Sequence, residues 1–258
     1  MDFKTITYAL TGGIATITLN RPDVMNALSR QMRLELLDAL QAASDQARVL
    51  VITGAGRAFC SGQDLTDAAR HGALDLEKTL NDEYVPLLMA LTHCPIPTIA
   101  AVNGAAAGAG ANLALAADVV IASACASFIQ AFTRIGLVPD AGGTYWLPRQ
   151  IGMARAKGAM LFADKVTAQQ AMDWGMIYEC VPDDGFAAHV QARATQLATG
   201  PTVAYAGIKS ALLAAPGNNL AAQLALEAKL QGACGKTADF HEGVAAFLAK
   251  RVARFAGR

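Results

Sequence analysis

The sequence has 258 residues, is 53% hydrophobic and 16% charged, and carries 21 basic against 21 acidic residues, for a net charge of zero. That length can bury a large core, and the balanced charge favours neither nucleic acid nor an anionic membrane as a partner. No apolar run approaches the roughly 20 residues of a membrane-spanning helix, and the N-terminus lacks a signal pattern. The five cysteines are scattered without a Cys-x-x-Cys pair, so neither a disulfide framework nor a bound metal is expected. We therefore expect a cytoplasmic protein.

Up to about residue 180, short strand-like runs alternate with helical segments. Residues 5–9 and 14–19 flank a Thr-Gly-Gly turn, which predicts a hairpin. This alternation predicts an α/β fold with mostly parallel strands and crossover helices. Further strands are expected at residues 49–52, 98–102, 119–122 and 176–178, and helices at residues 29–46, 82–92 and 153–162.

Beyond Asp183 the pattern is helical throughout. These segments are rich in alanine and unusually apolar for surface helices, so we expect them to pack against their own core or another subunit. We accordingly divide the chain into a core of residues 1–182 and a helical C-terminal region of residues 183–258.

Two glycine-rich segments follow predicted strands, at residues 54–65 and 103–112. A small-residue loop that opens a helix presents bare backbone N–H groups and the positive helix end, which suits an anion or an oxyanion. Two such loops at the ends of parallel strands would share one crevice. Each loop taken singly also fits an ordinary strand-to-helix connection.

A carboxylate occurs in a third turn, Ile-Gly-Leu-Val-Pro-Asp-Ala-Gly-Gly-Thr at residues 135–144. This residue, Asp140, has apolar neighbours in Phe132, Ile135, Leu137 and Val138, and an apolar setting would raise its pKa. One base and one oxyanion site suffice for proton-transfer chemistry.

Other polar candidates receive structural interpretations. Asp118 is expected to serve as a hydrogen-bonding residue, and Asp64 to be ionised and turned to solvent. Cys60 has no evident base and is expected to be buried. His71 and His93 are isolated, without a nucleophile or metal-like spacing.

Six short motifs are spread over nearly the whole chain, at residues 20–22, 26–28, 58–65, 101–104, 136–144 and 242–251. Together they resemble the enoyl-CoA hydratase/isomerase (crotonase) superfamily. The resemblance implies a spiral of ββα turns, a helical C-terminal region used for trimerisation, and an acyl-CoA thioester as substrate. It also implies a homotrimer or a dimer of trimers, and no cofactor, because coenzyme A is part of the substrate.

The resemblance also implies roles for individual residues. The backbone N–H groups of Gln63 and Ala109 correspond to the oxyanion hole. The two glutamates that hydratases of the family use correspond to Asn112 and Phe132, which are expected in the substrate pocket. Neither can transfer a proton, so efficient hydration is not expected. Asp140 falls where isomerase-type members carry their catalytic acid.

Contacts with coenzyme A follow from the same resemblance. Arg21, Ala27 and Ala58 are expected near the pantetheine and phosphates. Phe247 and Lys250 of a neighbouring subunit are expected to close over the adenine end.

The sequence therefore predicts an acyl-CoA isomerase with one carboxylate base. Among isomerase-type members, the chain resembles most the ring-epoxide isomerases of phenylacetate catabolism, which act on 1,2-epoxyphenylacetyl-CoA and also shift Δ3 double bonds to Δ2, as in fatty acid metabolism. Two alternatives stay open: an enoyl-CoA hydratase with an unusual active site, and a non-catalytic acyl-CoA-binding protein. Asp140, where hydratases typically carry a glycine, is the feature against the last.

Overall fold

The computed structural model describes residues 2–66 and 75–258. Their strands form two sheets, one of six strands in the order β1-β2-β3-β5-β7-β10 and one of four in the order β4-β6-β8-β9. The strands are β1 (Ile6–Thr11), β2 (Ile14–Leu19), β3 (Val49–Gly54), β4 (Ala58–Cys60), β5 (Thr98–Val102), β6 (Ala105–Ala107), β7 (Val119–Ser123), β8 (Ser127–Ile129), β9 (Val166–Thr167) and β10 (Glu179–Val181).

The first helix begins after a residue whose side chain caps its N-terminus. Ser29 caps the first helix, its hydroxyl accepting from the Met32 amide at 3.2 Å. The α-helices are α1 (Arg30–Gln46), α3 (Leu76–Thr79), α4 (Val85–Thr92), α5 (Ala109–Leu115), α6 (Gly143–Phe162), α7 (Ala168–Asp173), α8 (Phe186–Ala198), α9 (Thr202–Ala214), α10 (Leu220–Cys234) and α11 (Ala238–Leu248). Shorter turns are η1 (Pro22–Val24), the π-helical η2 (Leu80–Tyr84), η3 (Ala131–Ile135), η4 (Asp183–Gly185) and η5 (Ala215–Gly217).

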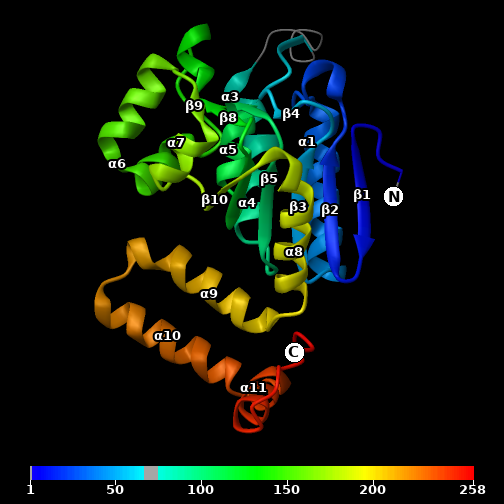
Figure 1. The fold of residues 1–258 in the computed structure, drawn as a ribbon. Helices are drawn as coiled ribbons and strands as arrows, with labels where there is room; N and C mark the ends of the chain where they lie inside the picture. Colours follow the sequence, from blue (N-terminus) through cyan, green and yellow to red (C-terminus); the bar gives the residue numbers. More distant parts are fainter. Residues whose placement is uncertain (1, 67–74) are drawn as a thin grey trace.

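The central strands β3, β5 and β7 of the large sheet are buried on both faces, with helices on either side in Figure 1. In β3, Leu50 and Ile52 belong to the core cluster that includes α1 and α4, whereas Val49 and Val51 belong to a second cluster with α8. Successive side chains of a strand point to opposite faces, so a strand covered on both sides is apolar at every position. This double burial explains the continuous apolar runs in the sequence.

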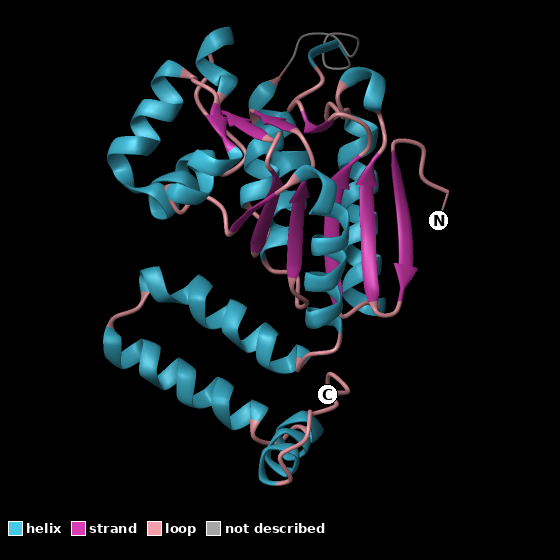
Figure 2. Cartoon of the chain, viewed as in Figure 1, coloured by secondary structure: helices cyan, strands magenta, loops and turns pink. Residues whose placement is uncertain are grey.

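The two sheets are built together, turn by turn. The chain passes from β3 to β4, from β5 to β6 and from β7 to β8, so each turn adds one strand to each sheet. Both series pair in parallel. In Figure 2 the small sheet lies above the large one, and its strands run across the direction of the large-sheet strands. This is the α/β spiral that the resemblance implied.

The predicted elements differ from the observed ones at several places. Residues 176–178 form turns, and the strand expected there is β10, three residues later. The expected helix at residues 82–92 is divided between η2 and α4. The helix expected at residues 153–162 is the second part of α6, which is interrupted at Gly152 with φ of 78°.

The helical C-terminal region contains two kinds of helix. α8 packs on the large sheet through Val190, Ala194 and Ala198, whereas α9, α10 and α11 lie apart from both sheets in Figure 1. In the described ranges, no helix is long and apolar enough to cross a membrane. Large apolar side chains that α9, α10 and α11 leave exposed are Ile208, Leu212, Leu220, Leu224, Phe240, Val244, Phe247 and Leu248.

Candidate active site

Three loops meet at one edge of the small sheet. Gln63 follows β4, Ala109 follows β6 and opens α5, and Asp140 follows β8 and η3. Because β4, β6 and β8 are parallel neighbours, the loops after them emerge on the same side. All three residues line one cavity of about 310 Å³. The rest of its wall is mostly apolar and includes Leu65, Leu76, Leu80, Tyr84, Phe132, Ile135 and Leu137.

The backbone N–H of Gln63 points away from the segment around Leu28, with which Gln63 pairs. Leu28 forms a parallel bridge with Gln63, in which the Leu28 N–H donates to Gly62 O at 2.8 Å and Leu28 O accepts from Asp64 N at 3.2 Å. In a parallel bridge these bonds flank the central residue, whose own N–H lies on the opposite side. The Gln63 N–H is therefore left for the cavity.

Ala109 is the first residue of α5, and its N–H is the second candidate donor. The first four N–H groups of a helix have no partner inside the helix. The preceding Gly108 has φ of 52° and ψ of −129°, a combination open to glycine. This backbone conformation turns the chain from β6 into α5.

The loop before Gln63 and the loop before Ala109 approach each other closely. Gly62 has φ of 96°, and a Cβ built on it would lie 2.8 Å from Ala107 O and 3.5 Å from Ala109 N. Any side chain here would force the loops apart. The glycine thus permits the close approach of these loops that two backbone donors to one oxygen atom would require.

Asp140 faces the same cavity with an unusual carboxylate. Within the described residues its Oδ1 is buried and accepts no hydrogen bond. Loss of hydration raises the pKa of Asp140 from 3.8 to about 6. The carboxyl is thus ionised at neutral pH but poised to take up a proton, and this confirms the direction expected from its apolar neighbours.

Asn112 lies behind the cavity wall, not on it. Its side chain is fully buried, and its Nδ2 donates to Asp140 O at 2.7 Å while its Oδ1 accepts from Gln130 Nε2 at 2.8 Å. The predicted place of Asn112 in the substrate pocket is therefore corrected: it holds the main chain of Asp140. Phe132 does line the cavity, facing Gly108.

The remaining candidates have structural surroundings. Asp118 accepts from Thr98 N at 2.7 Å and pairs with Lys209 at 2.6 Å, as expected for a structural carboxylate. Cys60 is fully buried, and burial raises the pKa of its thiol to about 12. His93 is exposed, and His71 lies outside the described residues. Across those residues, no group of three or more His, Cys, Asp and Glu side chains could hold a metal.

Comparison with known proteins agrees with this geometry. Residues 10–258 match the model of the enoyl-CoA hydratase/isomerase family. The chain belongs to this family. It is therefore similar to enzymes of the crotonase superfamily, for which an acyl-CoA thioester is the fitting substrate.

Individual members are similar over nearly their whole length. A protein of Rhodobacter capsulatus named a probable enoyl-CoA hydratase is 61% identical, with all of both chains covered. The 1,2-epoxyphenylacetyl-CoA isomerase of Escherichia coli is 46% identical over 95% of this chain and 96% of its own. A crystal structure of an enoyl-CoA hydratase from Bacillus anthracis superposes with a TM-score of 0.92 at 31% identity, covering 99% of this chain and 100% of its own.

Of the five residues expected near coenzyme A, Arg21, Ala27 and Ala58 lie close to one another around Asn26. Arg21 Nη1 donates to Ala27 O at 2.7 Å and to Asp64 Oδ2 at 2.8 Å. Asp64 is only 8% exposed, so the expectation that it faces solvent was wrong: the ion pair with Arg21 draws it inward.

The other four residues do not surround the cavity. Ala27 and Ala58 are buried, and Ala58 O accepts from the Asn26 amide at 2.8 Å; their contact with coenzyme A stays a prediction. Phe247 and Lys250 are exposed at the end of α11, away from the small sheet (Figure 1). They do not line the cavity of their own chain.

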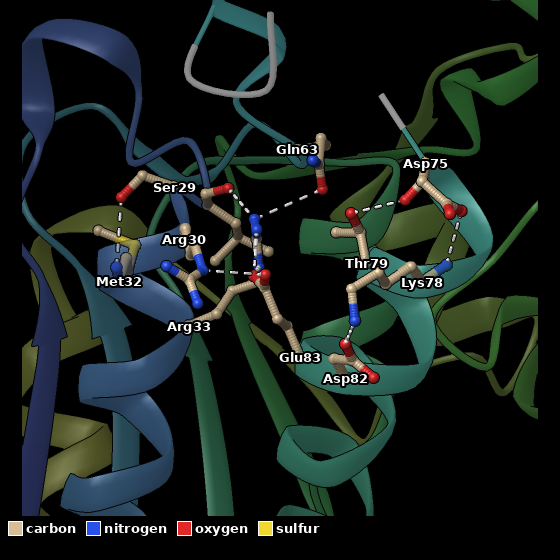
Figure 3. Close-up of polar contacts among 11 residues, drawn as sticks. Ser29, Arg30, Met32, Arg33, Gln63, Asp75, Lys78, Thr79, Asp82 and Glu83 are labelled. Carbon is tan, nitrogen blue, oxygen red and sulfur yellow. Dashed lines mark hydrogen bonds and ion pairs between the residues drawn. The ribbon is translucent and has the colours of Figure 1, made fainter. Parts of the chain in front are cut away.

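One polar cluster beside the family's predicted oxyanion loop was missed from the sequence. Arg33 of α1 lies between the Gln63 side chain and Glu83 of η2, with dashed contacts to both in Figure 3. Its one signal was a basic residue on the apolar side of the helix predicted at residues 29–46, next to the buried Met32. Solvation would have been the ordinary assumption for such a charge.

Proposed function

We propose that this chain is an acyl-CoA isomerase in which Asp140 moves the proton and the N–H groups of Gln63 and Ala109 bind the thioester oxygen. The observation that carries the proposal is the desolvated carboxylate of Asp140, with a pKa of about 6, in the same cavity as the two backbone donors. A base with a pKa just below neutrality is well matched to repeated proton transfer.

The reaction neither gains nor loses a proton overall. In a β,γ-unsaturated acyl-CoA, Asp140 removes a proton from the carbon next to the thioester. The electron pair of that C–H bond forms a double bond between the carbonyl carbon and the α-carbon, and the carbonyl π pair moves onto oxygen, which gives a dienolate whose oxygen carries the negative charge. Two N–H groups stabilise that oxygen. The α,β double bond forms in the second step, when the β,γ electron pair takes up a proton at the γ-carbon. The protonated Asp140 then returns the same proton to the γ-carbon, so the double bond has moved and nothing has been added.

The apolar cavity wall supports an acyl group with a ring. Phe132 and Tyr84 both line the cavity, and aromatic side chains pack well against flat groups. Similarity to the Escherichia coli 1,2-epoxyphenylacetyl-CoA isomerase supports the same substrate class. We therefore infer action on 1,2-epoxyphenylacetyl-CoA, Δ3 to Δ2 isomerisation of enoyl-CoA, or both, in phenylacetate or fatty acid catabolism.

Hydration of an enoyl-CoA is the second candidate, because the relative at 61% identity carries a hydratase name. The environment of the site argues against it. Asn112 is fully buried and its amide is hydrogen-bonded to Asp140 O and Gln130, and an amide is no proton-transferring acid. Phe132 has no group that transfers a proton.

Parallel assays of the purified protein discriminate these functions. One follows conjugation of a β,γ-unsaturated acyl-CoA, a second follows hydration of crotonyl-CoA, and a third measures binding of butanoyl-CoA by calorimetry. The proposal expects conjugation with negligible hydration. Hydration without conjugation would establish the second candidate, and binding without either turnover would leave an acyl-CoA-binding protein.

Assembly into homotrimers, or dimers of trimers, is proposed alongside. It is supported by the exposed apolar side chains of α9, α10 and α11, which monomeric proteins seldom leave in such number. Phe247 and Lys250 would then approach coenzyme A in a neighbouring subunit. Light scattering coupled to size exclusion tests this, and a monomer at micromolar concentration would contradict it.

A further inference from the structure

We propose that Arg33, Glu83 and Tyr84 form a positioning network that sets the oxyanion hole, joining its Gln63 donor to the wall of the acyl cavity. The proposal rests on the proposed function in one respect, that the Gln63 N–H is an oxyanion donor. None of the three is assigned to the proton transfer.

Arg33 holds both the side chain of Gln63 and the segment that clasps its backbone. Its Nη1 donates to Leu28 O at 2.6 Å and reaches Gln63 Oε1 at 3.5 Å. Leu28 O is the same atom that accepts from Asp64 N, so it lies in the bridge that orients the Gln63 peptide. Arg33 is 4% exposed, and a buried guanidinium with fixed partners leaves little freedom to the groups that it binds.

Tyr84 holds Gln63 from the cavity side. Its hydroxyl donates to Gln63 Oε1, and its ring lies under the Arg33 guanidinium, 4.8 Å from the centroid. Tyr84 itself lines the cavity. A substrate group packed against the tyrosine ring is therefore one hydrogen bond away from the residue that supplies the oxyanion donor.

Glu83 completes the network from the same turn. Its Oε2 accepts from Arg33 Nε at 2.9 Å and Nη2 at 2.5 Å, as Figure 3 shows. Glu83 and Tyr84 are the last two residues of the π-helical turn η2. Such turns are rare in proteins, but those that occur are often found at functional sites. Here the turn presents adjacent residues to two sides of one arginine.

The magnitude of the effect follows from what an oxyanion donor contributes. Removal of one donor costs on the order of 100- to 1000-fold in rate, and a misplacement of about 1 Å costs about 100-fold. Loss of one tether to a side chain whose backbone bridge stays intact should cost less. We expect about tenfold in stabilisation of an enolate, with little effect on a ligand that carries no negative oxygen.

Two ligands separate positioning from simple binding. Acetoacetyl-CoA ionises to an enolate, whose ultraviolet absorbance reports its capture by an oxyanion hole, whereas butanoyl-CoA is a neutral saturated thioester of the same length. The ratio of their dissociation constants measures enolate stabilisation. The measurement does not require Asp140 to act as the base.

Tyr84→Phe is the decisive variant, because it deletes one oxygen atom and keeps the ring. Gln63→Met removes the acceptor but keeps the backbone N–H. Arg33→Ala would leave Glu83 partly buried without its main partner and could prevent folding, so it is not relied on. Arg30→Ala is the matched control. Its side chain is 61% exposed and pairs with the same Glu83 at 3.2 Å.

The network predicts a loss of about tenfold in the ratio for Tyr84→Phe and for Gln63→Met, no further loss when the two are combined, and an unchanged ratio for Arg30→Ala. Melting temperatures should stay close to wild type. Equal weakening of both ligands, no change in either, or additive losses in the double variant would overturn the network while the wild-type preference for the enolate stood. A wild type with no such preference would overturn the oxyanion hole itself, and the network with it.

Discussion

The side-chain amide of Asn112 donates to the main-chain carbonyl of Asp140 at 2.7 Å, from a fully buried position. A residue at the position where a hydratase would carry one of its acids thus serves as a support for the proposed isomerase base. The amide also accepts from Gln130, so its orientation is fixed from both ends.

Asn112→Ala should lower the rate of isomerisation without a matching change in KM. Releasing the Asp140 carbonyl lets the carboxylate shift, and a small displacement of a base costs about 10- to 100-fold in kcat. Losing both hydrogen bonds of a buried amide should also cost about 2 kcal/mol in the free energy of unfolding. Steady-state kinetics and urea unfolding measure the two effects.

The matched control is Gln130→Leu, which removes the other partner of the same amide and leaves the bond to Asp140 in place. It should lose stability while kcat falls much less than in Asn112→Ala. Equal losses of kcat in the two variants would assign Asn112 to packing alone.

The pH dependence of kcat/KM should report the raised pKa of Asp140. A base works in its ionised form, so the rate should be level above the pKa of about 6 and fall about tenfold for each pH unit below it. Binding of butanoyl-CoA, which needs no base, should stay constant over the same range. A midpoint near 3.8, the ordinary value for an aspartate, would show that the carboxylate is well hydrated.

Asp140→Asn should raise stability near neutral pH. The native state holds this carboxyl at a higher pKa than the unfolded chain does, so its ionisation opposes folding. That penalty is absent below pH 3.8, grows as the pH rises towards the native pKa of about 6, and is constant above that pH. Since the group is partly hydrated, we expect a gain of about 1 kcal/mol at pH 7.5 that vanishes near pH 3.5, measured by urea unfolding. A variant less stable than wild type at pH 7.5 would contradict a strained carboxylate.

Gly108→Ala should disrupt the oxyanion hole through the backbone. With φ of 52° and ψ of −129°, a Cβ costs about 1–3 kcal/mol or turns the N–H of Ala109 away from the cavity. Isomerisation should fall at least 100-fold. Gly12→Ala is the control, because Gly12 also has a positive φ, 59°, but lies in the hairpin between β1 and β2 with open space around it. Similar activity losses in both would indicate global destabilisation.

The large sheet was predictable because burial on both faces leaves a continuous apolar run. Residues 49–52, 98–102 and 119–122 all lie within β3, β5 and β7. The small sheet was not predictable in the same way. Its strands β4, β6 and β8 are three residues long, and Ala105–Ala107 has no β-branched side chain to mark it.

The site could be predicted where its chemistry resides in the main chain. Glycines at positions 62 and 108 accompany the two proposed backbone donors, which the resemblance implied, and an acid in an apolar turn marks the proposed base Asp140; these signals are local. The inward turn of Asp64 towards Arg21 and the burial of Arg33 depend on residues far away in the sequence. Local pattern cannot reveal such partners.

The central claim, that one carboxylate carries the reaction, is tested most directly by comparing wild type and Asp140→Asn on a β,γ-unsaturated acyl-CoA, with butanoyl-CoA binding as the measure of an intact pocket. The account predicts that conjugation falls at least 1000-fold while binding changes less than about threefold. Undiminished conjugation in Asp140→Asn, with binding intact, would contradict it and remove Asp140 from the mechanism.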